Sequence, residues 1–452
     1  MKKRIVILGG GESGVGAALL AKEMKFEVFV SDNGPLKAKH RDELNKHEIE
    51  FEESKHTEKK ILNANTVIKS PGISDSAAIV KQVKANNIPI VDEIEFAFNY
   101  IKGKVIAVTG TNGKTTTTLL IYHLLKTAGL NVCLAGNVGE SLAKKVALGV
   151  ADWYVVELSS FQLDGVITFK PDVAILLNIT PDHLDRYDNK ISNYIDSKFK
   201  MIRNMGQEDY FIYYVDDPIG GEEAQQRSTE AYRVGISMDQ NATSAVRFDG
   251  QYMVFQFGKN NFKISSQEVK LKGEHNIINT MAAASAAFLA NVSPTQISEG
   301  LKTFVNAPHR LEPIATINGV EFVNDSKATN VFSTKYAIES FNQPIIWIVG
   351  GYDKGNDYNI LKDLVVSKVK SIVCLGKDNS KIVSFFGQIE KSIYDNNCLS
   401  DAVSTAFRIA NPGDVILLSP ACASFDLFDN YEDRGNKFRE EIRLLEKRNN
   451  NF

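Results

Sequence analysis

The stretch Gly103-Lys-Val-Ile-Ala-Val-Thr-Gly-Thr-Asn-Gly-Lys-Thr-Thr-Thr-Thr118 decides the fold of this chain. Its first part, Lys104 to Thr109, is apolar and β-branched between glycines, which is typical of a short buried strand. The segment Gly110 to Thr115 predicts a sharp turn, and leucines at helical spacing then predict a helix that ends at Gly129. Backbone N–H groups and the helix dipole at such a junction attract phosphate, Lys114 adds positive charge, and a threonine hydroxyl can bind Mg²⁺.

The spacing of this loop departs from the common phosphate-binding pattern at one position. That pattern has glycine five residues before the Gly-Lys pair, and here the position holds Val108. The simpler alternative is a glycine-rich turn that carries an exposed lysine. We favour the phosphate loop because a strand and a helix both lie where the binding mechanism needs them.

The composition indicates an ordinary globular protein of about three domains. The chain has 452 residues, of which 43% are hydrophobic and 24% are charged, and its net charge is −3. This charge gives no reason to expect nucleic acid or an anionic membrane as a partner. The four cysteines lack paired metal-ligand spacing, and no apolar run approaches transmembrane length. We therefore expect a cytosolic protein without a disulfide framework and without membrane insertion.

A second glycine motif lies near the N-terminus. Residues 4–8 predict a strand, Gly9 to Gly14 match the G-x-G-x-x-G pattern, and a second strand over Glu27 to Ser31 leads to Asp32. An acidic residue about 20 positions after the glycines is typical of dinucleotide binding, so this motif alone indicates a nicotinamide enzyme. The alternative is a Rossmann-like turn that binds another nucleotide or none, because a fold does not fix a function. This first α/β unit ends near residue 100.

Two strands of the second unit carry candidate metal ligands. Trp153 to Leu158 predicts a strand with Glu157 near its end, and Val173 to Ile179 predicts a central strand followed by His183. Because ligands bind beyond the carboxyl ends of parallel strands, we expect both side chains on the same rim as the phosphate loop. A carboxylate and an imidazole near a triphosphate are candidate Mg²⁺ ligands, although imidazole is unusual for this hard cation. For His183 the alternative is a surface loop.

The remaining candidates come later in the chain. Lys198 lies in a helix-like stretch, where physical reasoning alone predicts a solvated side chain without a role. His309 and Arg310 lie at the predicted end of the second unit, where ligand sites often form. In the third unit, strands over Val320–Val323, Ile345–Val349 and Val415–Leu418 end in polar segments that supply Lys327, Lys354 and Ser424. These ends predict either an anion or carboxylate site or a charged surface rim.

Taken together, these segments resemble the Mur ligase family over nearly the whole chain. The matching segments are Gly110–Thr115, Glu157–Gln162, Asn178–Asp185, His275-Asn276, Pro308–Arg310, Asp325–Asn330 and Ser419–Asp426. The loop is that family's variant of the phosphate loop, which accounts for Val108. The last two segments are most like those of members that add D-glutamate to UDP-N-acetylmuramoyl-L-alanine in peptidoglycan precursor synthesis.

The resemblance implies an α/β fold of three domains. Residues 1–100 would form an N-terminal Rossmann-like domain that binds the UDP substrate. Residues 101–308 would form a central P-loop ATPase-like domain with a mostly parallel sheet, and residues 309–452 a C-terminal Rossmann-like α/β domain that binds the amino acid. A monomer in the cytoplasm is expected.

The resemblance also implies a role for each matching residue. The nucleotide, ATP, would be bound by Gly110, Thr111, Asn112, Gly113, Lys114, Thr115, Thr116, Asn276, Asn279, Arg310 and Asp325. Two Mg²⁺ ions would be held by Thr115, Glu157, His183 and Lys198, the last as a carbamylated lysine. The two substrates would be bound by Ser13, Asp32, Gly72, Asn137, Ser159, Lys327, Thr329, Lys354, Ser424 and Tyr431. Tyr431 replaces an expected phenylalanine, and Gly34 stands where some members have an arginine beside the uracil.

The implied reaction is amide-bond formation through an acyl phosphate. The catalytic residues would be Lys114, Glu157, His183, Lys198 and His309. ATP would phosphorylate the substrate carboxylate, and the amine of D-glutamate would then displace the phosphate. Either His309 or a phosphate oxygen could take the proton of the amine. Two rival functions are a nicotinamide dehydrogenase, which leaves the Gly110 loop unused, and a nucleotide-dependent switch, which leaves the polar strand ends of the third unit unused.

Overall fold

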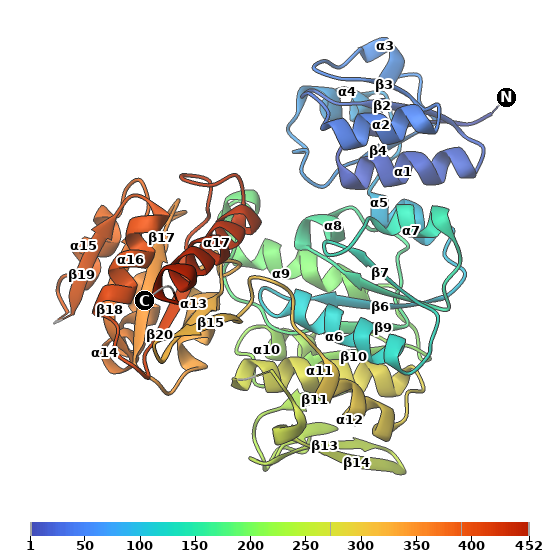
Figure 1. Cartoon of the computed structure of the whole chain (residues 1–452). Helices are drawn as coiled ribbons and strands as arrows, with labels where there is room; N and C mark the ends of the chain where they lie inside the picture. The colour runs from blue at the N-terminus through green and yellow to red at the C-terminus, as the bar shows by residue number, and fades with distance from the viewer. Residues whose placement is uncertain (1, 272, 390, 451–452) are drawn as a thin grey trace. The chain divides into compact units, whose positions relative to one another are not determined.

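The computed structural model of the chain describes residues 2–271, 273–389 and 391–450 (Figure 1). These residues form three sheets of mostly parallel strands with helices between them, an α/β architecture. The chain divides into two compact units. The first contains residues 1–270 and 277–304, and the second contains residues 271–276 and 305–452. The boundaries at residues 100 and 308 stay predictions.

The first sheet is wholly parallel, with the strand order β3-β2-β1-β4-β5. Its strands are β1 (Arg4–Leu8), β2 (Glu27–Ser31), β3 (Glu50–Glu52), β4 (Thr66–Lys69) and β5 (Ile90–Val91). The helices of this part are α1 (Glu12–Glu23), α2 (Ala38–Lys46), α3 (Glu58–Ile61), α4 (Ala78–Ala85) and α5 (Glu93–Phe98). The strand order reverses at β1, so the Gly9–Gly14 turn after β1 lies where doubly wound sheets bind ligands.

The second sheet has the order β14-β13-β12-β11-β10-β9-β6-β8-β7. Its strands are β6 (Lys104–Thr109), β7 (Val132–Gly136), β8 (Trp153–Glu157), β9 (Val173–Leu176), β10 (Tyr210–Tyr214), β11 (Tyr232–Ser237), β12 (Val246–Phe248), β13 (Tyr252–Phe257) and β14 (Asn260–Ser265). The strand before the phosphate loop, β6, lies between β8 and β9 and is parallel to both. The turn at Asp249-Gly250 joins β12 and β13 as an antiparallel hairpin.

Helices connect the strands of this second sheet. They are α6 (Lys114–Thr127), α7 (Leu142–Leu148), α8 (Ser160–Asp164), α9 (Ile191–Phe199), α10 (Gly220–Gln226), α11 (Glu274–Leu289) and α12 (Pro294–Thr303), with 3₁₀ turns η1 (Leu184–Arg186), η2 (Lys200–Ile202) and η3 (Ser266–Glu268). The predicted strand over Val173–Ile179 is too long, because β9 ends at Leu176. The residues after it bond to the phosphate loop instead: Asn178 O accepts from Thr111 N at 2.9 Å, and Asn178 Oδ1 accepts from Asn112 N at 2.8 Å.

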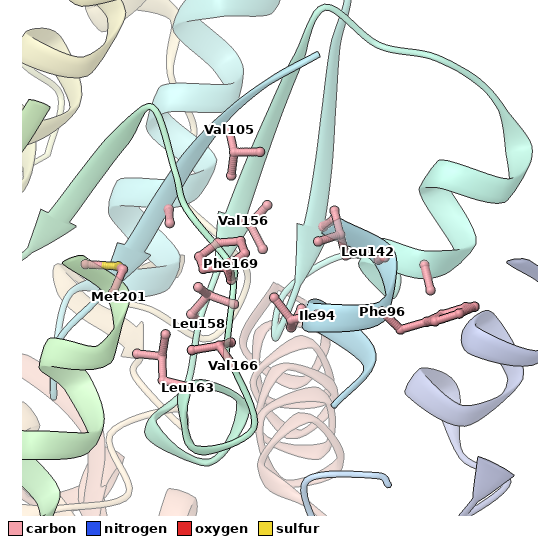
Figure 2. Packing of buried hydrophobic residues seen from close by; sticks show 14 of the residues in the cluster. Ile94, Phe96, Val105, Leu142, Val156, Leu158, Leu163, Val166, Phe169 and Met201 are labelled. Atoms are coloured by element: carbon pink, nitrogen blue, oxygen red, sulfur yellow. The ribbon is translucent and has the colours of Figure 1, made fainter. Parts of the chain in front are cut away.

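A single buried cluster spans the first two sheets. It contains Ile5 of β1, Ile94 of α5 and Val156 of β8. Figure 2 shows how Ile94 lies with Leu158 and other buried side chains of this cluster. The first two sheets therefore share one hydrophobic core around α5, although each follows its own α/β pattern.

The second unit holds a third sheet of order β15-β16-β20-β17-β18-β19. Its strands are β15 (Glu312–Ile317), β16 (Val320–Asn324), β17 (Ile345–Gly350), β18 (Val369–Leu375), β19 (Ser392–Asn396) and β20 (Val415–Ala421). Its helices are α13 (Val331–Glu339), α14 (Lys362–Lys368), α15 (Ser380–Phe386), α16 (Leu399–Ile409) and α17 (Tyr431–Asn450), with the 3₁₀ turn η4 (Tyr358–Leu361). All neighbours are parallel except β15 and β16, and a buried cluster covers each face of the sheet.

Two expectations about the whole chain can be compared with the structure. All four cysteines are free, as predicted. Within residues 2–271, 273–389 and 391–450, no helix combines the length and the apolar character needed to cross a membrane.

Candidate active site

The phosphate loop is held in place by the segment that follows β9. Gly110 and Gly113 have φ of 150° and 84°, which only glycine adopts without strain. Thr111 Oγ1 donates to Thr180 O at 3.0 Å and accepts from Thr180 N at 3.0 Å. Together with the two bonds that Thr111 N and Asn112 N donate to Asn178, these contacts fix the loop at the N-terminus of α6, where backbone N–H groups favour phosphate.

Lys114 and Lys198 meet at this loop. Lys114 Nζ donates to Gly110 O at 2.9 Å and to Thr111 O at 2.8 Å, and Lys198 Nζ donates to the same Gly110 oxygen at 2.9 Å. Lys198 is only 2% exposed, so the prediction of a solvated lysine is wrong. Helix α9 turns this side chain inward beside the ring of Tyr194, whose centroid is 4.5 Å from Nζ.

The environment of Lys198 disfavours its charged form. Burial and the charge of Lys114 together place the pKa of Lys198 well below its ordinary value. A lowered pKa increases the neutral fraction of the amine, and the neutral amine is the form that can act as a nucleophile.

Lys114 and Lys198 line a cavity of about 410 Å³ in the first unit. The predicted site residues that line it are Ser13, Gly72, Thr111, Lys114, Asn137, Ser159, His183 and Lys198. The cavity therefore joins the phosphate loop to the glycine turn after β1 and to the turn after β4. Clefts of this size, lined by convergent polar groups, are typical of substrate sites.

Glu157 lies beside this cavity with one oxygen unpartnered. Its Oε1 accepts from Asn137 Nδ2 at 2.7 Å. Its Oε2 is buried and has no hydrogen-bond partner among the described residues, and the whole side chain is 1% exposed. A buried carboxylate oxygen without a donor is costly, and a cation at that position would relieve the cost.

His183 reaches the same cavity from the loop after β9. Its side chain is 43% exposed, and its ring lies 5.1 Å from that of Phe161. Arg186 stacks over the same Phe161 ring at 4.1 Å and donates to Pro71 O at 3.1 Å. The loop that carries His183 is thus tied to the turn after β4. Among the described residues, no three His, Cys, Asp or Glu side chains gather into a preformed metal centre.

Two predicted residues of the first unit are structural as well as candidate binders. Asp32 does not line the large cavity; its oxygens accept from Gly10 N at 2.6 Å and Gly34 N at 2.8 Å. Ser159 caps α8, because its side chain pairs with Gln162 in a capping box.

Asn279 is buried next to the phosphate loop, since a Cβ on Gly113 would lie 2.5 Å from its Oδ1. The loop residues Thr115 and Thr116 are also buried.

In the second unit, the predicted residues gather where β16, β17 and β20 end. Asp325 accepts from Ser419 Oγ at 2.9 Å, and burial raises the pKa of Asp325 to about 7 against the opposing effect of this bond. Lys327 Nζ lies 5.2 Å from the centre of the Tyr431 ring. Ser424 is buried on the loop after β20, while Lys354 is exposed on the loop after β17.

The buried Arg434 and several backbone bonds hold these loops together. Arg434 of α17 donates to Ser326 O at 2.9 Å and to Cys422 O at 3.2 Å. Thr329 N donates to Lys327 O at 3.0 Å. Arg310 has a buried Nε without a hydrogen-bond partner among the described residues, which suits an anion. Asn276 is buried in the same unit.

His309 is buried and supports the backbone at Lys327. It is 5% exposed; its Nδ1 lies 2.9 Å from Asn324 Nδ2, and its carbonyl oxygen accepts from Lys327 N at 3.1 Å. An amide nitrogen donates, so His309 Nδ1 accepts and the ring proton is on Nε2. A Cβ at Gly435 would overlap Nδ1, so α17 packs directly on the ring. This arrangement favours a positioning role over transfer of the amine proton.

Several cavity residues were not predicted from the sequence. They are Glu12, Pro71, Gly136, Gly139, Ser160, Phe161, Gln162, Asp182 and Tyr194. Tyr194 had a signal, because it precedes Lys198 by one helical turn and so lies on the same face of α9. The glycines and Pro71 belong to turns whose approach to the cavity depends on the sheet order.

Known protein families match each part of the chain. The family model described as Mur ligase middle domain matches residues 108–287, the MurD N-terminal domain matches residues 4–79, and the Mur ligase, glutamate ligase domain matches residues 309–422. All three sheets are represented in these matches.

Curated relatives match over almost the full length. The UDP-N-acetylmuramoylalanine--D-glutamate ligase of Christiangramia forsetii is 48% identical over 445 residues, which cover 98% of this chain and 100% of that protein. The protein of the same name from Porphyromonas gingivalis strain W83 is 49% identical and covers 98% of this chain and 99% of that protein. The one from Salinibacter ruber is 38% identical, with 98% of both chains covered.

Solved structures support the fold. UDP-N-acetylmuramate-alanine ligase from Thermotoga maritima has a TM-score of 0.64 at 18% identity, covering 98% of this chain and 99% of that one. A MurF ligase from the same organism, in complex with ADP, has a TM-score of 0.61 at 15% identity, covering 92% and 95%.

Proposed function

The chain belongs to the Mur ligase family, and on that basis we propose that it is the ATP-dependent ligase that adds D-glutamate to UDP-N-acetylmuramoyl-L-alanine in peptidoglycan precursor synthesis. A nicotinamide dehydrogenase, which the Gly9–Gly14 motif alone indicated, leaves the phosphate loop and its two lysines without a task. A nucleotide switch leaves the polar strand ends within residues 305–452, in the second compact unit, without a task.

The observation that carries the proposal is the cavity of about 410 Å³. It brings the ATP loop, through Lys114, to the turns at Ser13 and Gly72 that are expected to hold the UDP substrate. A carboxylate is a poor acylating agent, so it must meet the γ-phosphate of ATP before it can react with an amine. The shared cavity lets the two meet, and positioning is the main demand of phosphoryl transfer.

In the first step, a carboxylate oxygen of the UDP substrate bonds to the γ-phosphorus of ATP, and the bond to the β-phosphate oxygen breaks, releasing ADP. In the second, the amine of D-glutamate attacks the acyl carbon, the phosphate leaves, and the amine nitrogen loses one proton. Lys114 stabilises the charge on the transferred group, because its ammonium already lies among the loop carbonyls.

We include two Mg²⁺ ions in the proposal, which would neutralise phosphate charge when bound. Glu157 fits one ion through its buried Oε2, which has no hydrogen-bond partner in the described part of the chain. Thr115, His183 and a carbamylated Lys198 are the other proposed ligands. Mg²⁺ usually takes only one or two protein carboxylates together with phosphate oxygens, so the lack of a larger acidic cluster among the described residues suits this assignment.

Lys198 is proposed to act as a carbamate. Its neutral amine would add to CO₂, forming the N–C bond and releasing one proton, and the product is an anion in place of a cation. Burial and the nearby Lys114 charge, which lower the pKa of Lys198, make the neutral amine available for this reaction. An anion there would also replace the repulsion between two lysines by an attraction.

The second unit is proposed to bind the amino acid and part of ATP. Lys327, Lys354, Thr329, Ser424 and Tyr431 would hold D-glutamate, with the lysines opposite its carboxylates. Asn276, Asn279, Arg310 and Asp325 are the further residues proposed to contact the nucleotide. His309 would support Lys327 through the backbone bond between them. A monomer located in the cytoplasm completes the proposal.

One assay tests the proposed function directly. Phosphate release from ATP is measured with UDP-N-acetylmuramoyl-L-alanine present, with and without D-glutamate. We expect release to depend on D-glutamate, because only the amine completes the turnover. Release that is equally fast without D-glutamate contradicts the ligase assignment, and NAD(H) binding without this activity would favour the dehydrogenase.

A further inference from the structure

A second cavity of the first unit lies away from the phosphate loop. It has a volume of about 380 Å³, and its lining includes Gly9, Asp32, Asn33, His56, Ile73 and Ile79. Gly9 follows β1 and Asp32 follows β2, so the cavity opens at the carboxyl ends of neighbouring parallel strands. Doubly wound sheets bind nucleotides at such ends, and this one has room for a base and a ribose.

Glu52 begins a chain of hydrogen bonds that ends at this cavity. Its carboxylate is 7% exposed and accepts from Thr57 N at 2.7 Å, Thr57 Oγ1 at 2.6 Å and Ser31 Oγ at 2.7 Å. Burial raises the pKa of Glu52, but these donors outweigh it and leave the pKa below its ordinary value. Glu52 therefore carries no proton at neutral pH and can only accept.

The chain of bonds fixes the proton of His56. Ser31 Oγ lies 2.7 Å from His56 Nδ1, and the single proton of Ser31 is already directed to Glu52. Ser31 Oγ also lies 3.5 Å from Lys55 O, and a bond to that carbonyl oxygen would likewise use the single proton of Ser31. Ser31 must then accept, so Nδ1 of His56 carries a proton, and in this tautomer of the imidazole Nε2 is an acceptor. The His56 ring makes no other hydrogen bond within the described part of the chain.

We propose that Nε2 of His56 accepts a hydrogen bond from N3–H of uracil and makes this cavity specific for the uridine nucleotide of the substrate. The inference rests on the proposed function, which requires a UDP-linked substrate. Uracil presents a donor at N3, whereas cytosine, a ring of the same size, presents an acceptor there. Two facing acceptors repel and leave both unsatisfied, so a fixed acceptor rejects cytosine.

The neighbouring groups leave this task to His56. Each oxygen of Asp32 already accepts a backbone bond, from Gly10 N and Gly34 N, so this carboxylate holds the turns around the base. Gly34 has no side chain to contact a base. Ile73 and Ile79 supply apolar surface that suits the flat faces of a pyrimidine.

Direct binding of UDP and CDP to the full chain tests the proposal. Calorimetric titration of the unmodified protein should give at least about tenfold tighter binding of UDP. In His56→Ala, we expect this preference to fall to less than about threefold, mainly through loss of UDP affinity. His56→Gln, which can still present an acceptor, should keep part of the preference. His47→Ala changes an exposed histidine at the end of α2 and should leave the ratio unchanged.

Ser31→Ala examines the chain of bonds itself. It removes the group that fixes the His56 proton, so the UDP preference should fall to a value between those of the unmodified protein and His56→Ala. Circular dichroism and the thermal midpoint confirm that each variant is folded; if His56→Ala unfolds, His56→Gln and Ser31→Ala decide.

The proposal is overturned if the unmodified protein binds UDP and CDP equally, or if the preference survives in His56→Ala. The phosphate-release assay distinguishes the role of His56 from the ligase assignment. D-glutamate-dependent release with an unchanged UDP preference in His56→Ala overturns only the role of His56. Failure of that assay beside a His56-dependent UDP preference overturns only the ligase assignment.

Discussion

At the scale of single residues, Lys198 shows how position changes chemistry. The same side chain on an exposed helix face would be a solvated cation, but here it shares the Gly110 carbonyl oxygen with Lys114. Only a neutral or a carbamylated Lys198 avoids a buried positive charge beside the half-buried ammonium of Lys114. Its protonation state therefore decides whether the loop can accept a metal ion beside the phosphates.

We expect Lys198→Ala to lower kcat by at least about 100-fold, because it removes the proposed anionic ligand. Short-chain carboxylic acids should restore part of the activity by occupying the space left by the carbamate. Lys200→Ala is the matched control: Lys200 lies two residues later and pairs with Asp164 at 3.2 Å, so its loss should change kcat less than about twofold. Full activity of Lys198→Ala without added acid would contradict the carbamate.

Glu157→Gln tests the proposed metal ligand. Glutamine keeps an oxygen for Asn137 Nδ2 but removes the charge. We therefore expect Mg²⁺ to bind more weakly, so that half-maximal activity needs a higher Mg²⁺ concentration, and the activity to be at least about tenfold lower. Thermal stability should stay equal or rise, since a buried carboxylate oxygen without a partner is lost. Activity is titrated with Mg²⁺, and the thermal midpoint is measured alongside. Lower stability together with an unchanged Mg²⁺ titration would assign Glu157 to packing alone.

At the scale of elements, α5 carries acidic side chains into the core between the first two sheets. Glu93 Oε1 accepts from Ala143 N at 2.6 Å, and Glu95 accepts from Thr168 N at 2.9 Å. Burial, assisted by the charge of Asp92, raises the pKa of Glu93 to about 8, while burial raises the pKa of Asp92 to about 7. This short helix therefore contributes a dependence of stability on pH.

The sign of that dependence follows from the raised pKa. Between pH 4.5 and about 8, the native state holds a proton on Glu93 that the unfolded chain has lost. The free energy of unfolding therefore falls as pH rises through this window. We expect Glu93→Gln to make the slope shallower, by no more than about 1.4 kcal/mol per pH unit. Urea unfolding at several pH values measures it, with Glu23→Gln on the exposed end of α1 as the control. Equal slopes in Glu93→Gln and the unmodified protein would contradict the raised pKa.

Elements also show where sequence reasoning ends. The strand β6 and the loop after it were predicted because the apolar run and the glycines are local signals. The end of β9 was not, because Asn178 leaves the sheet to bond the phosphate loop, and that bond joins residues far apart in sequence. Strand β15 contains Pro313, which disfavours strands, and it forms at a sheet edge where the register shifts beside this proline.

At the scale of the whole molecule, some site residues could be placed from the sequence and others could not. The glycine motifs, Glu157 and His183 could be placed on strand ends from sequence because parallel strands bring their carboxyl ends to one edge. The inward direction of Lys198 and the proton arrangement at His56 could not, because both depend on packing and on bonds from distant residues. The roles implied by the family resemblance stay predictions at every site residue.

The two compact units have separate cores, and their stabilities can be measured separately. Ile94 lies in the cluster shared by the first two sheets, and Ile338 lies in a cluster of the third; both are fully buried. We expect calorimetry to show two unfolding transitions. Ile94→Ala should lower the free energy of unfolding of the first unit by about 2–5 kcal/mol, and Ile338→Ala should lower that of the second unit by a similar amount. If each substitution moves both transitions equally, the units unfold as one body.

The close packing of Gly435 against His309 predicts which substitutions a genetic selection would tolerate at this position. Every single-nucleotide change of a glycine codon that alters the residue adds at least a Cβ, and a Cβ at this position overlaps the His309 ring. His309 would have to move, and its carbonyl oxygen holds the backbone of Lys327. We therefore expect position 435 to accumulate no neutral alleles, although glycine offers no side chain to a ligand. In a saturation library selected for growth, position 435 should be as depleted of variants as Lys114 and Lys198, which we propose to be catalytic.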